Sequence, residues 1–173
     1  MARTGRPAGW SRLQGYLHWL TVILVGVQVF AGDWMSDLWR ARTRGEEIGS
    51  GDVALGWIHA IVGVAILVST VLRIWDRLTF GRPPYPAGNP AWSVWLAKAN
   101  HFLLYAVLVL MPLLGATAFL GGIEDAADLH EALWAPLLAL IALHVAGALT
   151  EHFYFRNDVL RRMIRPGSRG ERS

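Results

Sequence analysis

The fold is decided by a 25-residue stretch at positions 99–123, which reads ANHFLLYAVLVLMPLLGATAFLGGI and contains no Asp, Glu, Lys or Arg. A helix needs about 20 apolar residues to cross the hydrocarbon core of a bilayer. Three further stretches of 19 or 20 residues lack the same four residue types; they are 13–32, 53–72 and 132–150. Because hydrocarbon offers no partners to backbone N–H and C=O groups, each stretch is predicted to be helical.

Four spans with short connections predict an all-α membrane protein, folded as an antiparallel four-helix transmembrane bundle. We place the spans at about 13–32, 53–73, 99–121 and 130–152, within a single domain of residues 1–165. The composition agrees, since 54% of the 173 residues are hydrophobic and only 17% are charged, against about a quarter in soluble domains. The absence of Cys excludes disulfides, iron–sulfur clusters, thiolate zinc sites and covalently attached haem.

Basic residues predict the orientation of the bundle. The N-terminal segment, the second connection and the C-terminal segment carry 13 of the 16 Lys and Arg residues, and the first connection carries Arg40, Arg42 and Arg44. The positive-inside rule therefore places both termini in the cytoplasm, with residues 166–173 as a disordered tail. We interpret the basic excess as topology and contact with anionic lipid, not as a nucleic-acid interface.

Histidines inside the spans are the strongest functional signal, because a polar ring in hydrocarbon is costly. His130 and His144 are 14 residues apart, about 40° short of four helical turns, so they share one helix face about 21 Å apart. The expected topology puts His59 at the level of His130 and His18 at the level of His144. The sequence thus predicts two pairs of imidazoles on facing helices, and each pair offers the two axial ligands of a six-coordinate haem iron.

A purely structural role, without haem, stays open for these histidines and for the glycines near them. A single membrane histidine often only hydrogen-bonds between helices. Glycines one turn from the histidines, such as Gly15, Gly63 and Gly147, pack bare helices as readily as they make room for a porphyrin.

Four other residues lie on the cytoplasmic side of the predicted bundle. Arg73 is at the depth of the His18–His144 pair, where it either neutralises a haem propionate or anchors the span. His101, His152 and Arg12 lie at the cytoplasmic boundary, and a substrate role stays open for the two histidines. The two histidines are also consistent with plain interfacial residues.

Several short motifs around these histidines form a recognisable pattern. They are RLQ at 12–14 before HWL at 18–20, LHE at 129–131 with a histidine fourteen residues on, and HFYF at 152–155 before LRRM at 160–163. With these motifs the chain resembles, over nearly its whole length, the bacterial cytochrome b561 family of small four-helix di-haem membrane proteins. The resemblance implies that His18 and His144 hold a cytoplasm-side haem b, and that His59 and His130 hold a periplasm-side one.

The resemblance also implies electron transfer between a partner outside and ubiquinone in the bacterial inner membrane. For the quinone site we name His101, His152 and Arg12 on the cytoplasmic side, because quinone reduction consumes protons and histidine titrates near neutral pH. Some family members are superoxide oxidases that pass an electron from superoxide to ubiquinone, so superoxide is the leading donor and Arg40, Arg42 and Arg44 are expected to attract it if they face the outer site. Two departures from the family pattern stand out. His152 follows His144 by eight residues instead of seven, which adds about 100° of rotation on a straight helix, and the loop at 121–128 is short.

Two other classes of protein remain open. One is a cytochrome b anchor or relay subunit of another membrane redox enzyme, which would co-purify with a partner protein. The other is a haem-free transporter or scaffold, which the colour of the purified membranes would distinguish. The four uncharged stretches at 13–32, 53–72, 99–123 and 132–150 contain no acidic residue to line a transport path.

Overall fold

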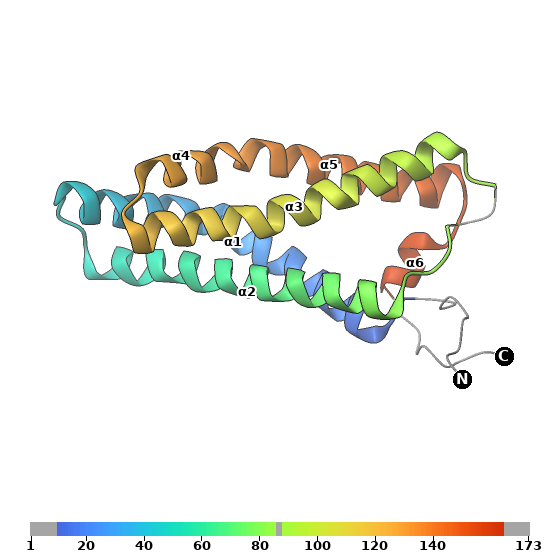
Figure 1. Ribbon diagram of the computed structural model, residues 1–173, viewed down its shortest axis with the longest axis horizontal. Helices are drawn as coiled ribbons and strands as arrows, with labels where there is room; N and C mark the ends of the chain where they lie inside the picture. Colours follow the sequence, from blue (N-terminus) through green and yellow to red (C-terminus); the bar gives the residue numbers. More distant parts are fainter. Residues whose placement is uncertain (1–9, 86–87, 165–173) are drawn as a thin grey trace.

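The computed structural model describes residues 10–85 and 88–164, and the chain forms long antiparallel helices (Figure 1). In chain order the elements are α1 (Arg12–Arg44), α2 (Ser50–Phe80), α3 (Ala91–Gly121), α4 (Glu124–Ala132), α5 (Trp134–Leu149), the π-helix η1 (Thr150–Tyr154) and α6 (Val159–Ile164). Four helical units, with Glu124–Tyr154 as the fourth, are long and apolar enough to cross a membrane. The predicted four-helix transmembrane bundle is confirmed; the predicted tail, 166–173, lies outside the described residues.

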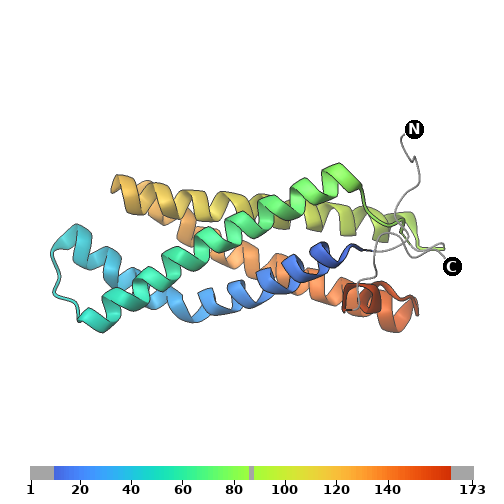
Figure 2. The same cartoon turned by 90° about the horizontal axis from the view of Figure 1, so that it is seen from below.

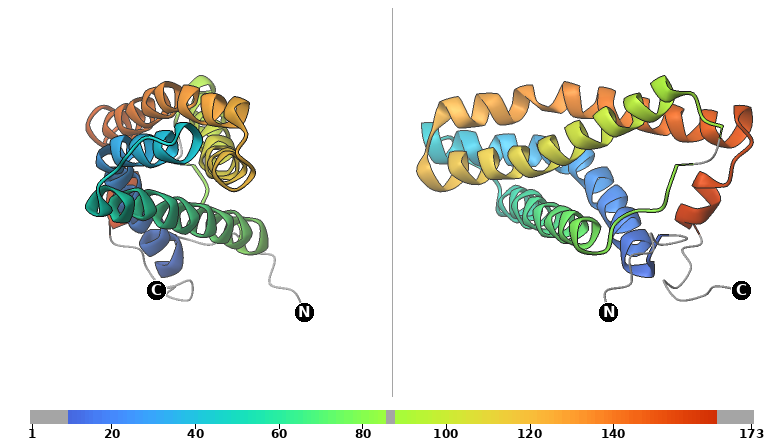
Figure 3. Two further views of the ribbon diagram at one scale, coloured as in Figure 1. Left: turned by 90° about the vertical axis from the view of Figure 1, so that its left-hand side faces the viewer. Right: turned by 45° about the vertical axis from the view of Figure 1, so that its right-hand side comes forward.

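The two ends of the bundle differ in what they hold. At one end, here called the terminal end, α1 begins, α2 gives way to α3, and the fourth span finishes at η1 (Figure 2). At the other, here called the loop end, short connections join α1 to α2 and α3 to α4. The short helix α6 lies off the axis of the bundle at the terminal end (Figure 3). Trp19 in α1 fixes it there by donating its indole N–H to the carbonyl of Met163 at 3.3 Å.

The helices run past the apolar stretches that define the spans, because their ends carry good caps. Ser11 accepts a hydrogen bond from the backbone N–H of Gln14 at 3.0 Å and starts α1. Gly45 and Gly122 end α1 and α3 with φ of 71° and 69°, a backbone conformation that suits glycine. The 33 residues of α1 therefore extend about 50 Å, well beyond a hydrocarbon core of about 30 Å.

Polar side chains repeat every seven residues along the face of α1 that meets α2. Gln14 donates to the carbonyl of Arg73 at 3.2 Å, Thr21 shares a hydrogen bond with Ser69 at 2.9 Å, and Gln28 donates to the carbonyl of His59 at 3.1 Å. Such interhelical bonds contribute on average about 0.6 kcal/mol each in a membrane. Their heptad spacing fixes the register between α1 and α2, which carry His18 and His59.

The fourth span bends at Leu133, between α4 and α5. Pro136 explains the bend, because proline has no N–H to give to the carbonyl of Ala132, and its ring crowds that carbonyl. The span is also loosely packed, since Leu137 is the only buried residue of α5 within the described chain. Leu137 meets Ile66 and Leu108 in the centre of the bundle, so the apolar core lies midway between the two ends.

Candidate functional site

At the loop end of the bundle, His59 of α2 faces His130 of α4. Their ring centroids are 6.0 Å apart, with an angle of 67° between the ring planes. Nδ1 of His130 lies 2.7 Å from the carbonyl oxygen of Met111, and because a carbonyl only accepts, Nδ1 carries the proton. Nε2 of His130 therefore keeps a lone pair that is available to a metal.

Helix α3 supplies the room for the ring of His130. A Cβ added at Gly115 would lie 3.0 Å from both Nδ1 and Cε1 of this ring, closer than most side chains tolerate. Gly115 and the carbonyl of Met111 lie one turn apart on α3 and act together, one giving space and the other accepting a hydrogen bond. Sequence analysis missed both residues, although Gly115 follows Pro112 inside an apolar span and could have drawn attention.

At the terminal end, His18 of α1 faces His144 of α5. Their ring centroids are also 6.0 Å apart, with an interplanar angle of 58°. A third ring joins them, because His101 of α3 packs edge-on against His144 at 5.1 Å between centroids. His101 donates from Nδ1 to the carbonyl of Ala97 at 2.5 Å, so its own Nε2 is not protonated in the neutral ring.

Arg73 lies within this group of rings. Its Nη2 is 3.2 Å from Nδ1 of His18 and its guanidinium is 5.4 Å from the centre of the Tyr105 ring. The side chain is nearly inaccessible, with 9% of its surface exposed. A buried guanidinium with one hydrogen bond to a neutral ring is only partly satisfied, which favours an anionic partner at this place.

The spacing within each pair fits a six-coordinate haem iron. With metal–nitrogen bonds of about 2 Å and a ring nitrogen about 1 Å from the ring centre, two imidazoles on opposite sides of one iron have centroids about 6 Å apart. Within the described residues no group of three or more His, Cys, Asp or Glu side chains is placed to hold a bare metal ion. A porphyrin supplies the four remaining nitrogens itself. A Cβ at Gly26 or Gly147 would meet no atom within 4 Å, so space is open beside these helices.

This geometry agrees with the comparison to known proteins. The model of a family described as prokaryotic cytochrome b561 matches residues 9–166. The chain belongs to the prokaryotic cytochrome b561 family. The resemblance noted from its motifs is thereby confirmed, and the chain is a multi-pass membrane cytochrome that binds haem b and transfers electrons.

Three curated relatives are similar over almost their whole length. A cytochrome b562 of Cereibacter sphaeroides is 34% identical over 159 residues, covering 91% of this chain and 96% of the relative. A probable superoxide oxidase CybB of Yersinia pestis is 29% identical over 182 residues, covering 93% and 98%. Cytochrome b561 homolog 1 of Escherichia coli K12 is 26% identical over 176 residues, covering 89% and 96%.

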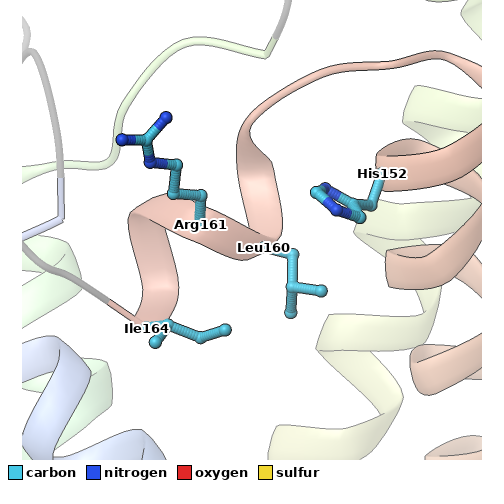
Figure 4. Close-up of a pocket in the computed structure, with 4 residues that line it drawn as sticks. All are labelled: His152, Leu160, Arg161 and Ile164. Atoms are coloured by element: carbon cyan, nitrogen blue, oxygen red, sulfur yellow. The ribbon is translucent and has the colours of Figure 1, made fainter.

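The remaining candidates from the sequence lie apart from one another in this cytochrome. His101 belongs to the terminal-end rings, whereas His152 lines a cavity of about 380 Å³ with Leu160, Arg161 and Ile164 of α6. In Figure 4 the ring of His152 projects toward α6, while Arg161 extends away from it. Nδ1 of His152 is buried and has no hydrogen-bond partner in the described part of the chain. Arg12 is exposed at the start of α1.

The turn that carries α6 is fixed by polar contacts around Glu151. Asn89 donates to both carboxylate oxygens of Glu151 at 2.8 Å, and Asn157 donates to one of them. Arg162 hydrogen-bonds Asp158 at 2.7 Å, and this bond holds the pKa of that carboxyl below its usual value. These contacts hold the turn before α6, and α6 supplies Leu160, Arg161 and Ile164 to the cavity beside His152.

Between His144 and His152 the fourth span changes from α-helix to the π-helix η1. Here the N–H of Phe155 bonds to the carbonyl of Thr150 at 3.1 Å, five residues back instead of four. A π-turn winds less per residue than an α-helix, so it removes part of the rotation that the eight-residue spacing adds. The expected rotation of about 100° assumed a straight α-helix, which η1 interrupts.

Deleting Thr150 is expected to convert η1 into α-helix and to leave the haem content unchanged, because a π-turn is a one-residue insertion that a helix can lose. Deleting Leu138 instead removes a residue between His130 and His144 and rotates one ring against the other by about 100°, so haem should be lost. The ratio of haem to protein in purified samples checks both variants. Equal haem loss in the two variants would show that η1 is not a separable insertion.

Proposed function

We propose that the chain transfers electrons through two b-type haems between a donor outside the cytoplasm and ubiquinone in the bacterial inner membrane, with both termini cytoplasmic. Superoxide is the leading candidate for the donor. The observation that carries the proposal is the pair of imidazole couples, each with 6.0 Å between ring centroids, at two levels of one bundle. Bound between such couples, a six-coordinate haem gives and takes single electrons and has no open iron position for oxygen chemistry.

The protein's part at each haem is to orient the ligands. At the loop end, Met111 holds the proton on Nδ1 of His130 and thereby leaves the lone pair of Nε2 available to iron. At the terminal end, a His18 that binds iron through Nε2 must carry its proton on Nδ1. We therefore expect Arg73, which now donates to that nitrogen, to turn instead to a haem propionate.

The relative described as a probable superoxide oxidase supports superoxide as the donor. In this reaction two superoxide anions lose one electron each and become dioxygen, while ubiquinone gains two electrons and two protons and becomes ubiquinol. Of the three loop-end arginines, Arg40 is engaged by Asp37 and Glu46, and Arg42 lies 4.7 Å from the centre of the Phe119 ring. Arg42 and Arg44 form no ion pair within the described residues, so these two are better placed than Arg40 to attract an anion.

His152 is our choice for the protonating group at the quinone. Its unpartnered Nδ1 can hydrogen-bond a quinone oxygen, and a cavity of about 380 Å³ is large enough for a quinone head group. The cavity opens at the end of the bundle that the basic residues assign to the cytoplasm, where protons are available. His101 packs against His144, so we assign it to the surroundings of the inner haem.

An assay of ubiquinol formation from superoxide by the purified holoprotein tests this function. We expect His152→Leu to lower the rate of ubiquinone reduction about 100-fold, the usual contribution of a general acid, while haem content and electron transfer to ferricyanide stay unchanged. Tyr154→Phe is the matched control, since Tyr154 is an exposed residue of the same turn whose ring packs on Phe155, and it should keep the full rate. A His152→Leu protein as fast as this control would remove the quinone assignment.

The alternative, a relay subunit of a larger redox enzyme, predicts a different outcome from the same preparation. Such a subunit would bind two haems, fail to reduce ubiquinone with superoxide when isolated, and co-purify with a partner protein from its own membranes. Ubiquinol formation by the isolated chain would exclude that alternative.

A further inference from the structure

A second cavity lies on the outside of the bundle, in the groove between α2 and α3 at the terminal end. It measures about 580 Å³ and does not include the paired histidines. Its apolar wall includes Phe102, Val109 and Leu113, and Arg77, Lys98 and Tyr105 lie toward the terminal end. The surface of Phe102 is 72% exposed, so the groove faces the surrounding lipid and not the bundle interior.

Within residues 10–85 and 88–164, the two cations of this groove, Arg77 and Lys98, have no acidic partner. No acidic side chain lines the groove, and none forms an ion pair with Arg77 or Lys98 in the described part of the chain. The guanidinium of Arg77 lies 5.6 Å from the centre of the Tyr105 ring, and Nζ of Lys98 lies 5.8 Å from that of Tyr85. Aromatic faces hold the cations in place but leave their hydrogen-bond donors available to an anion.

The length of the groove matches a lipid chain. From Lys98 to Leu113 is 15 residues, or about 22 Å of helix, and one leaflet including its head groups is about 20 to 22 Å deep. The cations are therefore at the level of the head groups, and the apolar wall runs down the depth of an acyl chain. Basic pockets between transmembrane helices at this level are typical binding sites for anionic lipid head groups.

We propose that the α2–α3 groove binds an anionic phospholipid, with the phosphate between Arg77 and Lys98 and an acyl chain along Phe102, Val109 and Leu113. A quinone is neutral and gains little from two unpaired cations, whereas a phosphodiester is neutralised by them. The groove thus holds a lipid that borders the terminal-end site at Tyr105, whose ring contacts both Arg73 and Arg77.

Native mass spectrometry of the haem-loaded protein, titrated with phosphatidylglycerol or phosphatidylcholine of the same acyl chains, tests this. We expect phosphatidylglycerol to bind about 30-fold more tightly, because two cations each contribute roughly a factor of five or six. The Arg77→Gln/Lys98→Gln variant should lose this preference. The control Arg156→Gln/Arg162→Gln removes two charges from the same end, including one exposed ion pair, and should keep it.

Two further experiments test whether phosphatidylglycerol binds in the groove and not merely to surface charge. Ala106→Trp fills the groove without changing its charge and should weaken phosphatidylglycerol binding. Glycerol phosphate, which lacks acyl chains, should not bind to the wild-type protein. Equal affinities for the two phospholipids, or loss of preference in the control alone, would overturn the proposal. Displacement of phosphatidylglycerol by ubiquinone at equal concentration would reassign the groove to the quinone.

Discussion

Replacing His144 with alanine is expected to reduce the haem content from two to one per chain and to abolish superoxide-driven ubiquinone reduction. The variant loses one of two axial ligands at the terminal end, whereas the His59–His130 pair at the loop end stays intact. A pyridine haemochrome assay against protein concentration gives the haem count, and a reduced-minus-oxidised spectrum shows whether the remaining haem is six-coordinate.

The position of His101 makes a second variant necessary. Its ring centroid is only 5.1 Å from that of His144, so His101 is close enough to replace the missing ligand after a small movement. We therefore expect the His101→Leu/His144→Ala double variant to hold one haem even if His144→Ala retains two. His101→Leu alone should keep both haems. A double variant that still binds two haems would show that the terminal-end assignment is wrong.

The membrane fold was readable from the sequence because hydrocarbon imposes a simple condition, the absence of charge over about 20 residues. The facing of His18 with His144 and of His59 with His130 followed from helix geometry and topology. The 14-residue spacing of His130 and His144 places both rings on one face only if the helix is straight. The fourth span bends at Leu133, yet each of the two rings still faces its partner on the neighbouring helix. That the four rings ligate iron stays a prediction.

Other features of the site depend on contacts between helices, which periodicity along one helix does not reveal. The approach of Gly115 to His130 requires α3 and α4 to pack closely, and the contact of His101 with His144 requires α3 to reach α5. The π-turn at Thr150–Tyr154 depends on the path of the chain into α6 and on the hydrogen bond between Asn89 and Glu151. The bend near Pro136, by contrast, was predictable from the sequence, because a proline near the start of a span interrupts helical hydrogen bonding and kinks the helix.

Gly115 provides a test of the loop-end site that leaves all four histidines in place. Because a Cβ at this position would lie 3.0 Å from two atoms of the His130 ring, Gly115→Val is expected to push the ring from the carbonyl of Met111 and to cost the loop-end haem. The haem count should fall from two to one, as in His130→Ala. Gly115→Ala, which adds only the Cβ, should retain more of this haem than Gly115→Val.

The matched control for this prediction is Ala116→Val, which adds similar bulk to the next residue of α3, an exposed position. It should retain both haems, since its side chain lies about 100° around the helix from Gly115. Retention of the terminal-end haem in Gly115→Val would show that the bundle is still folded, so the loss cannot be assigned to misfolding. If Gly115→Val instead keeps two haems with unchanged spectra, the loop-end haem is not held by His130 in the orientation that Met111 and Gly115 define.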